Sequence, residues 1–566
     1  MKKYASFRII LLTLVFGLAV AITAPAQTFQ TLAEFQATDG AVPLTGLILG
    51  SDGNFYGTTA DGGTPGPSCV YQGKGWTPGC GTVFQMTPTG TVTTLYSFCQ
   101  LLNCADGMYP NAGLVQGPDG NFYGTTQYTY IQEEGYIIGA QVGTVFRITP
   151  TGEFTTIYNF CSLLNCADGR SPSGLILGSD GNFYGTTQFG GANGGPNNGC
   201  INDVGQSVGC GTLFKLTPSG ELTTLYNFCS LSGCTDGFEP SGSLTQGSDG
   251  SFYGTAGAMY SSEIFQITPS GTETVLWLGP EFTGPAFNTP LVEDSAGNLY
   301  GTTFKGIGQE TDGGTVFQLS PAGVMTTLYT FCSQNSPQQP CTDGSWPAGG
   351  VILGTDGNLY GTTSIYGAYG TATAWVMGGT VFQLTPAGVL TTLYDFCSKS
   401  TCPDGTYPSG SLIQTSNGTF YGITSGGGTK IHSSSQNNTG GSNGEAYIYG
   451  YGTVFSWSPN VAVAPTFTPA TLTFPKQEVG TTSKAKSVTI KNVNTGTATL
   501  DLTGFTVSGP FAISANACGA TLAAHKSCKV LITFTPTATG PATGTLTISD
   551  NAPNSPQTVT LTGTGN

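Results

Sequence analysis

The chain has little of what catalytic or nucleic-acid-binding proteins normally use. Its 566 residues include only two histidines, His432 and His525, and 8% of the residues are charged. Lysine and arginine number 16 against 31 acidic residues, which gives a formal net charge of −15 at pH 7. Nucleic-acid binding needs a basic stripe that neutralises phosphates, and anionic membranes attract the same positive charge. The composition therefore excludes nucleic acid as a partner and leaves histidine-based catalysis with few candidates.

Apolar runs of membrane-spanning length are also lacking. Positive charges at the N-terminus precede an apolar segment over 9–21, which is too short for a good span, and small residues follow at Ala24 and Ala26. This order predicts a signal peptide over 1–26. We expect a secreted protein (periplasmic, extracellular or at the cell surface) that has no membrane span.

Repetition dominates the rest of the chain. The motif Asp-Gly-Asn-Phe-Tyr-Gly-Thr-Thr returns in recognisable form seven times, with its tyrosines at Tyr56, Tyr123, Tyr184, Tyr253, Tyr300, Tyr360 and Tyr421. A second motif, Gly-Thr-Val-Phe-Gln-(Leu/Met)-Thr-Pro, follows each copy and is centred on Phe84, Phe146, Phe214, Phe265, Phe317, Phe382 and Phe455. A repeat of this length, rich in β-formers and glycine turns, indicates one supersecondary unit copied around or along an axis.

Each repeat has the pattern of four antiparallel strands, which is typical of a propeller blade. The last copy, at 452–459, has no fourth strand after it, whereas residues 28–35 resemble a fourth strand that precedes the first copy. A closed ring needs such an offset and an open β-solenoid does not. We therefore expect an all-β fold: a seven-bladed β-propeller over 27–459, closed by the N-terminal strand 28–35.

A second domain follows the repeats. Residues 460–465 form a short linker, and 466–566 have the size of one domain. Short alternating apolar runs separated by turn residues predict an immunoglobulin-like β-sandwich.

Two family resemblances follow from these motifs. The order Gly-Leu-Ile…Asp-Gly-Asn-Phe-Tyr…Val-Phe…Pro-x-Gly resembles the NHL-type propeller repeat. Tyr-Gly-Thr-Thr with Gly-Thr-Val-Phe and Thr-Thr-Leu-Tyr is more closely similar to the Gloeo/Verruco tandem repeat of secreted bacterial proteins, over 28–459. Val479-Gly480-Thr481, Val488-Thr489-Ile490-Lys491-Asn492 and Ile532-Thr533-Phe534-Thr535-Pro536 resemble the Hydin/abnormal-spindle (choice-of-anchor D) type of immunoglobulin-like domain. The first resemblance implies a secreted repeat protein without a defined reaction, and the second implies adhesion or surface display.

Sixteen cysteines fall into near-neighbour pairs without remainder. An even count behind a signal peptide indicates disulfides. The pairs are Cys69 with Cys80, Cys99 with Cys104, Cys161 with Cys166, Cys200 with Cys210, Cys229 with Cys234, Cys332 with Cys341, Cys397 with Cys402, and Cys518 with Cys528. Zinc is the alternative, but it needs four ligands at one point, and pairs that recur about once per repeat should be spread around a ring. We therefore expect eight disulfides and no metal site.

The junction between consecutive repeats carries an Asp-Gly-x-x-Pro motif. Its aspartates are Asp39, Asp106, Asp168, Asp236, Asp343 and Asp404. If the first strand of each blade lines the central axis, these carboxylates would ring the channel mouth and could bind calcium. The alternative is local, because aspartate caps turns, glycine turns the chain and proline starts the next strand. We favour the local role and keep ligand binding as a candidate.

The loops between the second and third strands of each repeat are long, dissimilar and rich in aromatic residues. Blade geometry places them at the same end of the strands as the Asp-Gly-x-x-Pro junctions, and we call this end the long-loop face. Variable loops on a rigid scaffold are where binding usually resides. The candidates for ligand contact are Trp76, Tyr128, Tyr130, Tyr369, Trp375 and Tyr447. Alternatively, these side chains only pack their own loops.

The functional expectation is a secreted, non-enzymatic binding or cell-surface structural protein without cofactor or catalytic residues. Its partner would be an extracellular polysaccharide or protein. The alternative is an extracellular glycan-acting propeller enzyme that works through carboxylates. Its candidates are Glu133, Glu134, Asp203, Glu310 and Asp312, among which no spacing singles out a pair. The sequence leaves the ligand and the oligomeric state open.

Overall fold

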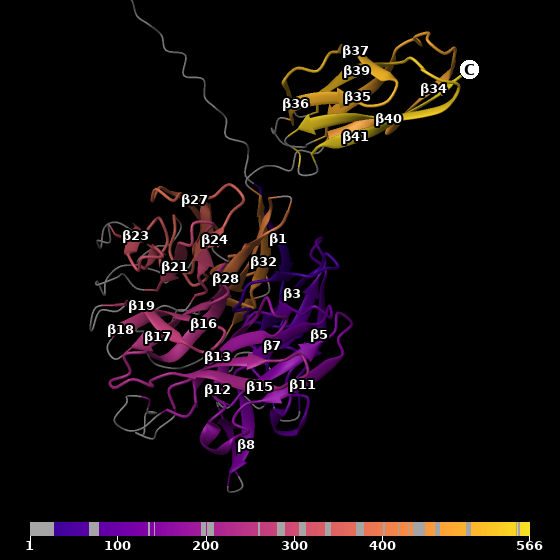
Figure 1. Cartoon of the computed structure of the whole chain (residues 1–566). Coiled ribbons are helices and arrows are strands. Elements are labelled where there is room, and N and C mark those ends of the chain that lie inside the picture. Colours follow the sequence, from indigo (N-terminus) through magenta and orange to yellow (C-terminus); the bar gives the residue numbers. More distant parts are fainter. Residues whose placement is uncertain are drawn as a thin grey trace, which may run out of the picture. The chain divides into compact units, whose positions relative to one another are not determined.

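The computed structural model divides the chain into two compact units (Figure 1). One unit is Phe29–Ser458, and the other includes Pro459–Asn566. The structure describes residues 28–66, 69, 79–133, 136–140, 142–193, 200, 209–258, 261–279, 289–304, 313–333, 341–368, 378–399, 402–416, 418–429, 431–433, 448–458, 465–493, 500–523, 525–550, 552 and 555–566. The predicted signal peptide lies outside these residues.

The described part of the first unit forms seven four-stranded sheets, here numbered in chain order. Sheet 1 contains β2 (Ile48–Leu49), β3 (Phe55–Thr59), β4 (Thr82–Met86) and β5 (Val92–Ser97). Sheet 2 contains β6 (Val115–Gln116), β7 (Phe122–Thr126), β10 (Thr144–Ile148) and β11 (Phe154–Asn159). Sheet 3 contains β12 (Arg170–Leu177), β13 (Phe183–Phe189), β14 (Thr212–Leu216) and β15 (Leu222–Asn227). Sheet 4 contains β16 (Phe238–Gln246), β17 (Phe252–Ala258), β18 (Ser261–Ile267) and β19 (Glu273–Leu278). Sheet 5 contains β20 (Val292–Glu293), β21 (Leu299–Thr303), β22 (Thr315–Leu319) and β23 (Met325–Thr330). Sheet 6 contains β24 (Ile352–Leu353), β25 (Leu359–Thr363), β26 (Thr380–Leu384) and β27 (Leu390–Asp395). Each sheet is therefore a simple antiparallel meander of one sequence repeat.

Sheet 7 is built from both ends of the unit. Its strands are β28 (Thr406–Gln414), β29 (Phe420–Gly426), β32 (Thr453–Ser458) and the N-terminal β1 (Thr28–Glu34), in the order β1-β32-β29-β28. Just beyond β1, the backbone N–H of Phe35 donates to the carbonyl of Gly452 at 3.0 Å. The N-terminal strand thus occupies the position that the fourth strand holds in the other sheets.

Each sheet packs on the next through its own hydrophobic cluster. Clusters of buried side chains join sheets 1 and 2, 2 and 3, 3 and 4, 4 and 5, 5 and 6, and 6 and 7. A further cluster joins sheet 7 to sheet 1, with Ile423 and Val454 against Phe55 and Phe84. The sheets therefore form a closed cycle of contacts.

Aromatic residues of the two repeated motifs provide much of this packing. The Tyr56 ring of sheet 1 stacks on Phe122 of sheet 2 with ring centroids 3.8 Å apart, and Tyr184 stacks on Phe252 at 4.1 Å. In β3 every residue is buried, since both faces of an inner strand are covered by neighbouring sheets. This explains why the strands lack a clear alternation of polar and apolar residues.

The glycine of Tyr-Gly-Thr-Thr is required by a ring on the neighbouring strand. Gly124 lies directly opposite Phe146 in the sheet, and a Cβ at Gly124 would lie 2.6 Å from Cζ of that ring. Gly57 and Phe84 have the same register, and the corresponding distance is also 2.6 Å. Because the phenylalanine is buried in the cluster between sheets, it has little room to move away.

Replacing Gly124 with alanine should therefore lower the free energy of unfolding of the first unit by about 1–3 kcal/mol, the usual cost of overpacking a core. Gly113 is the matched control, because the nearest atom to a Cβ there is 3.9 Å away and its φ is not positive. Gly113→Ala should leave the denaturation midpoint almost unchanged. Equal midpoints for the two variants in urea titrations would contradict this account of the motif.

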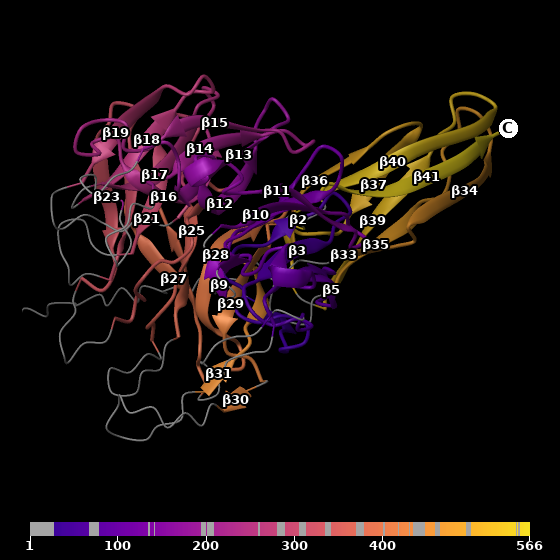
Figure 2. The ribbon, with the colours of Figure 1, turned by 90° about the horizontal axis from the view of Figure 1, so that it is seen from below.

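In the part of the chain that the structure describes, two of the loops between second and third strands carry hairpins of their own. The loop of sheet 2 contains β8 (Thr129–Glu133) and β9 (Tyr136–Ala140), and the loop of sheet 7 contains β30 (Ile431–Ser433) and β31 (Ile448–Gly450). Figure 1 shows β8 projecting beyond the four-stranded sheets, and Figure 2 shows the same for β30 and β31. These hairpins extend the long-loop face.

The second unit is a two-layer sandwich. One layer is β33 (Pro465–Thr468), β35 (Lys486–Asn492), β39 (Ser527–Phe534) and β37 (Phe511–Asn516); the other is β34 (Thr471–Gln477), β41 (Gln557–Gly565), β40 (Gly540–Asp550), β36 (Leu500–Val507) and β38 (Thr521–Leu522). Both layers contribute to one core, which includes Val488 and Ile532 from the first and Leu546 and Leu561 from the second. Strand β41 alternates buried and more exposed residues, as expected when one face of a sheet covers a core.

Helical structure is minimal in the part of the chain that the structure describes. Two short 3₁₀ turns, η1 (Leu102–Cys104) and η2 (Leu164–Cys166), lie in the junctions after sheets 1 and 2. Among the described residues, no helix is long and apolar enough to cross a membrane.

Candidate functional site

The aspartates of the Asp-Gly-Asn-Phe-Tyr motif organise the turns at the end opposite the long-loop face. Asp52 accepts hydrogen bonds from the backbone N–H of Asn54 at 3.1 Å, from its side-chain amide at 2.8 Å and from the Tyr56 hydroxyl at 2.8 Å. Burial would raise the pKa of Asp52, but the hydrogen bonds from Asn54 and Tyr56 outweigh it and hold that pKa below its ordinary value. Asp119, Asp180 and Asp356 have equivalent contacts. These aspartates act as turn residues, as the motif predicts.

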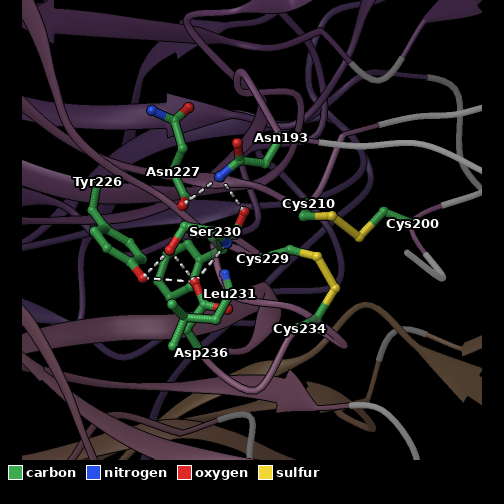
Figure 3. Close-up of a disulfide and its surroundings, with 11 residues drawn as sticks. Asn193, Cys200, Cys210, Tyr226, Asn227, Cys229, Ser230, Leu231, Cys234 and Asp236 are labelled. Carbon is green, nitrogen blue, oxygen red and sulfur yellow. Dashed lines mark hydrogen bonds between the residues drawn. A yellow bond between two sulfur atoms is a disulfide. The ribbon is translucent and has the colours of Figure 1, made fainter. Parts of the chain in front are cut away.

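On the long-loop face, four of the six junction aspartates, Asp106, Asp168, Asp236 and Asp404, are buried within their own loops, and Asp39 and Asp343 are half-buried. Asp236 accepts hydrogen bonds from the Tyr226 hydroxyl at 2.7 Å, from the backbone and hydroxyl of Ser230 at 2.6 and 2.7 Å, and from the backbone N–H of Leu231 at 3.0 Å (Figure 3). Burial opposes ionisation of Asp236, but these donors outweigh it and lower its pKa. Asp106 and Asp168 are fully buried and hold the same set of tyrosine and backbone donors.

Among the described residues, the other three junction aspartates have fewer partners. Asp343 accepts from the Tyr329 hydroxyl at 3.0 Å, and Asp404 accepts from the Tyr394 hydroxyl at 2.8 Å. Asp39 accepts from the backbone N–H of Gln36 at 2.6 Å. In all six junctions the carboxylate is thus engaged by its own segment of chain, which is the local role favoured by the sequence. Their candidacy as ligand contacts stays a prediction.

In five of the six junctions, the glycine after the aspartate lies against a pair of threonines in the following sheet. A Cβ at Gly40 would lie 2.6 Å from Thr59, whose hydroxyl is 2.8 Å from that of Thr82. Such threonine pairs recur in sheets 1, 2, 3, 5, 6 and 7: Thr59 with Thr82, Thr126 with Thr144, Thr187 with Thr212, Thr303 with Thr315, Thr363 with Thr380, and Thr424 with Thr453. They connect the second and third strands beneath the long-loop face.

Sheet 4 departs from this arrangement. Ala256 and Glu263 replace the two threonines, and the Glu263 side chain lies against Gly237, the junction glycine. Glu263 is fully buried, and neither of its carboxyl oxygens has a hydrogen-bond partner among the described residues. The sequence does mark this position, since Ser262-Glu263-Ile264-Phe265 departs from the repeated Gly-Thr-Val-Phe pattern. The departure matches no catalytic or metal-binding motif, so sequence reasoning did not single out Glu263.

Sheet 4 also has a second unusual carboxyl group. Glu273 begins β19, where the corresponding strands begin with apolar residues such as Phe154 and Leu222. Burial, with the nearby charges of Glu273 and Asp236, raises the pKa of Glu263 to about 9. Burial and Asp236 raise the pKa of Glu273 to about 7. The interface between sheets 3 and 4 therefore holds a buried carboxyl group that is neutral at pH 7.

A central cavity of about 540 Å³ lies where the seven sheets meet. It is lined mainly by the segments 44–46, 111–113, 171–174, 240–243, 348–350 and 409–411, which begin directly after the junction turns, and by Pro290 from the fifth sheet. The lining residues are glycine, serine, proline, alanine and other neutral residues, without a carboxylate or cation among them. None of the six junction aspartates lines this cavity, so they do not ring the channel at this level.

Most of the aromatic candidates of the long loops lie outside the residues that the structure describes. Trp76, Tyr369, Trp375 and Tyr447 lie outside the described residues, as do the carboxylates Glu134, Asp203, Glu310 and Asp312. Tyr130 and Glu133 belong to β8. Tyr128 precedes β8 and is half-buried, with its ring edge-on to Tyr109 at a centroid distance of 5.7 Å.

Eight disulfides join the cysteines as near neighbours, which confirms the pairing that the sequence predicts. In the first unit, disulfides join Cys69 to Cys80, Cys99 to Cys104, Cys161 to Cys166, Cys200 to Cys210, Cys229 to Cys234, Cys332 to Cys341, and Cys397 to Cys402. In the second unit, a disulfide joins Cys518 to Cys528, which belongs to β39. All sixteen cysteines are thereby paired, and none is a free thiol.

The expected spread of these pairs around the ring has exceptions, and in sheet 3 two complete pairs come together. Cys200 and Cys210 belong to the loop between second and third strands, whereas Cys229 and Cys234 belong to the junction after the fourth strand. The four sulfur atoms lie within 4.8 Å of one another (Figure 3). The two kinds of loop therefore do meet at one end of the sheet.

A model of the Gloeobacter/Verrucomicrobia repeat matches four overlapping stretches, residues 15–193, 74–277, 140–342 and 264–501. These stretches cover most of the chain. The protein belongs to the Gloeobacter/Verrucomicrobia repeat family. Each matched stretch spans several of the four-stranded sheets of this family member.

Residues 459–558 match a second model, the ASH domain (abnormal spindle-like microcephaly-associated, ASPM-SPD-2-Hydin), so this Gloeobacter/Verrucomicrobia repeat protein carries an ASH domain after its repeats. Among solved structures, the ASH/PapD-like domain 7 of human CEP192 is 18% identical with a TM-score of 0.15, covering 19% of this chain and 87% of that one. Searching curated proteins found no match.

Two solved structures resemble the repeat region more broadly. A streptogramin B lyase is 12% identical with a TM-score of 0.41, covering 76% of this chain and 97% of that one. A gluconolactonase from Xanthomonas campestris is 12% identical with a TM-score of 0.32, covering 78% and 92%. Similarity at this level carries no argument about reaction or ligand.

Proposed function

We propose that this protein is a secreted, non-enzymatic binding or cell-surface structural protein whose partner is recognised on the long-loop face. Its seven sheets would be the blades of a seven-bladed β-propeller over 27–459, closed by the strand 28–35. The second unit, 466–566, would be an immunoglobulin-like domain that attaches or spaces the propeller. The eight disulfides support an oxidising, extracytoplasmic location.

The observation that carries the proposal is the neutral lining of the central cavity. Glycoside-cleaving enzymes that work without histidine need two carboxyl groups facing one substrate site. No carboxylate lines this cavity in the described residues, and the junction aspartates are engaged within their own loops. The long loops, braced by disulfides and extended by hairpins, are then the part of the surface that differs from one repeat to the next. Bracing favours binding because an ordered loop loses less entropy when it meets a partner.

The partner should be neutral or cationic, because the formal net charge of −15 repels anionic polymers. An extracellular polysaccharide without acidic groups or an extracellular protein satisfies this condition. Aromatic rings with polar neighbours suit both, since they offer a large apolar contact with hydrogen-bonding edges.

The test is a pull-down of the full mature chain with neutral glycans, cell-wall fractions and secreted proteins, followed by paired variants. Alanine at Trp76, Trp375 and Tyr447 should weaken binding of a captured partner at least about tenfold, the usual effect of removing aromatic anchors. The control set is Asn54→Ser, Asn182→Ser and Asn358→Ser at the opposite turns. Sheet 4 already has serine there, and Ser251 donates its N–H to Asp249 as the asparagines do. The control set should bind as the parent does, and equal losses in both sets would overturn the assignment to the long-loop face.

A further inference from the structure

The four sulfurs in sheet 3 form a cluster that connects two loops. Cys200 and Cys210 are joined across the loop between β13 and β14, and Cys229 and Cys234 are joined in the junction between β15 and β16. All four sulfurs lie within 4.8 Å of one another, and all four residues are buried. A similar cluster occurs in sheet 1, where Cys69, Cys80 and Cys99 also lie within 4.8 Å of one another. The same two loops therefore place disulfides together twice.

Additional contacts fix the geometry of the sheet 3 cluster. The backbone N–H of Cys210 donates to the carbonyl of Asn193 at 3.2 Å, and the side-chain amide of Asn193 donates to the carbonyls of Asn227 and Phe228 at 2.9 and 3.1 Å. On the other loop, the N–H of Cys229 donates to the carbonyl of Gly237 at 2.9 Å. One cysteine of each disulfide, Cys210 and Cys229, is thus held in place by a backbone hydrogen bond.

Sheet 2 gives an internal comparison. Its junction has the same spacing of two cysteines, Cys161 and Cys166, but the loop between β7 and β10 has no cysteine. Cys161 and Cys166 are both partly exposed, whereas Cys229 and Cys234 are buried. The second disulfide therefore changes the surroundings of the first.

We propose that Cys200, Cys210, Cys229 and Cys234 form a thiol–disulfide exchange site in which the two loops can trade disulfide partners. A low-molecular-weight thiolate first attacks one disulfide, for example at the Cys200 sulfur, and forms a mixed disulfide with Cys200; the Cys200–Cys210 bond breaks, and Cys210 leaves and takes up a proton to become a thiol. After Cys210 loses its proton to water, its thiolate attacks the sulfur of Cys229. The Cys210–Cys229 bond forms, the Cys229–Cys234 bond breaks, and Cys234 leaves as a thiolate with the bonding electron pair. No net oxidation accompanies this step, because one disulfide and one thiol are present before and after it.

The exchange covalently links the long loop to the junction beside it. In the native pairing each disulfide closes a loop on itself, whereas Cys210–Cys229 joins the loop between β13 and β14 to the chain leaving β15. The site thereby lets a change in external thiol concentration alter the covalent bracing of the long-loop face.

The decisive variant is Cys200→Ser in the full mature chain, exported and oxidised. It leaves one thiol, at Cys210, beside the intact partner disulfide. The thiol is then blocked with N-ethylmaleimide at acid pH, and unreduced peptides are mapped by mass spectrometry. We expect the label to shift from Cys210 to Cys229 or Cys234 in the majority of chains, with a matching Cys210–Cys229 or Cys210–Cys234 peptide.

Cys166→Ser is the matched control, because it leaves Cys161 without a second disulfide nearby among the described residues. Its label should stay on Cys161. If Cys200→Ser likewise keeps its label on Cys210 and its Cys229–Cys234 disulfide intact, the proposal is overturned.

A second measurement uses the unmodified chain, so that it does not depend on the folding of any variant. Brief treatment with dithiothreitol followed by blocking should trap cross-loop peptides linking Cys200 or Cys210 to Cys229 or Cys234. Cys161 and Cys166 should yield only their native disulfide or two blocked thiols. Native disulfides alone in the sheet 3 peptides, at every stage of partial reduction, would also overturn the proposal.

Discussion

Removal of residues 28–35 is expected to lower the free energy of unfolding of the first unit by more than about 5 kcal/mol, since Phe→Ala changes in cores alone cost about 3–5 kcal/mol each. The deletion removes the buried Phe35 and also Phe29, whose ring stacks on Tyr394 at a centroid distance of 3.7 Å. It also exposes the backbone edge of β32, which invites pairing with other chains. Thermal unfolding followed by circular dichroism, together with gel filtration, measures both effects.

Point variants of the same strand separate packing from chain length. Phe35→Ala should lower the melting temperature clearly, whereas Gln30→Ala should change it little because Gln30 is exposed. A truncated chain that melts with the intact protein and stays monomeric would show that β1 does not close the unit.

The stability of the first unit should also fall as the pH rises from about 4.5 to about 9, because of Glu263. In the unfolded chain this carboxyl group ionises near its ordinary pKa, but in the folded chain burial, Glu273 and Asp236 raise its pKa to about 9. The unfolded state therefore binds fewer protons than the folded state across this window, so stability decreases with increasing pH. The loss approaches on the order of 5 kcal/mol, since each tenfold change in proton affinity corresponds to about 1.4 kcal/mol. The stabilising contribution is fully present below pH 4.5 and is gone above pH 9.

Glu263→Gln isolates this effect from other titrating groups. The substitution keeps the shape of the side chain and removes its proton equilibrium, so the difference between the two urea-denaturation profiles should grow with pH. The double variant Ala256→Thr with Glu263→Thr installs the threonine pair of the other six sheets and should raise stability at pH 8. Parallel pH profiles for the wild type and Glu263→Gln would refute a buried, neutral Glu263.

Much of the architecture could be predicted from sequence because the same pattern of strands and turns occurs in seven copies. The strand pattern, the turn role of Asp52 and its equivalents, and the near-neighbour disulfides all depend on residues close together in the chain. The extra strand before the first repeat was visible for the same reason: it resembles the fourth strands elsewhere.

The features that could not be predicted depend on contacts between segments whose distance from each other is not evident from the repeated pattern. The meeting of Cys200 and Cys210 with Cys229 and Cys234 could not be predicted, because pairing within each loop says nothing about the distance between loops. Glu263 was overlooked for a different reason. A single glutamate in a strand resembles a surface residue until the structure buries it beneath Gly237. For the junction aspartates the sequence favoured a local turn role over a ligand-binding ring at the channel mouth, and tyrosine and backbone donors do engage these side chains within the junctions.

Sheet 7 has a consequence for how the chain is made. β1 emerges before the other described strands of its unit during synthesis or export, yet its partner β32 is among the last of them, so β1 stays unpaired until nearly the whole unit has appeared. Sheets 1 to 6 each consist of contiguous chain and can assemble in turn, whereas the final step joins segments at opposite ends of the sequence. Such a pairing has high contact order and is slow to form. Nascent chains should therefore pass through an open intermediate that is prone to aggregate. Dilution or a chaperone should then improve the yield of folded protein most at the last folding step, when β1 pairs with β32.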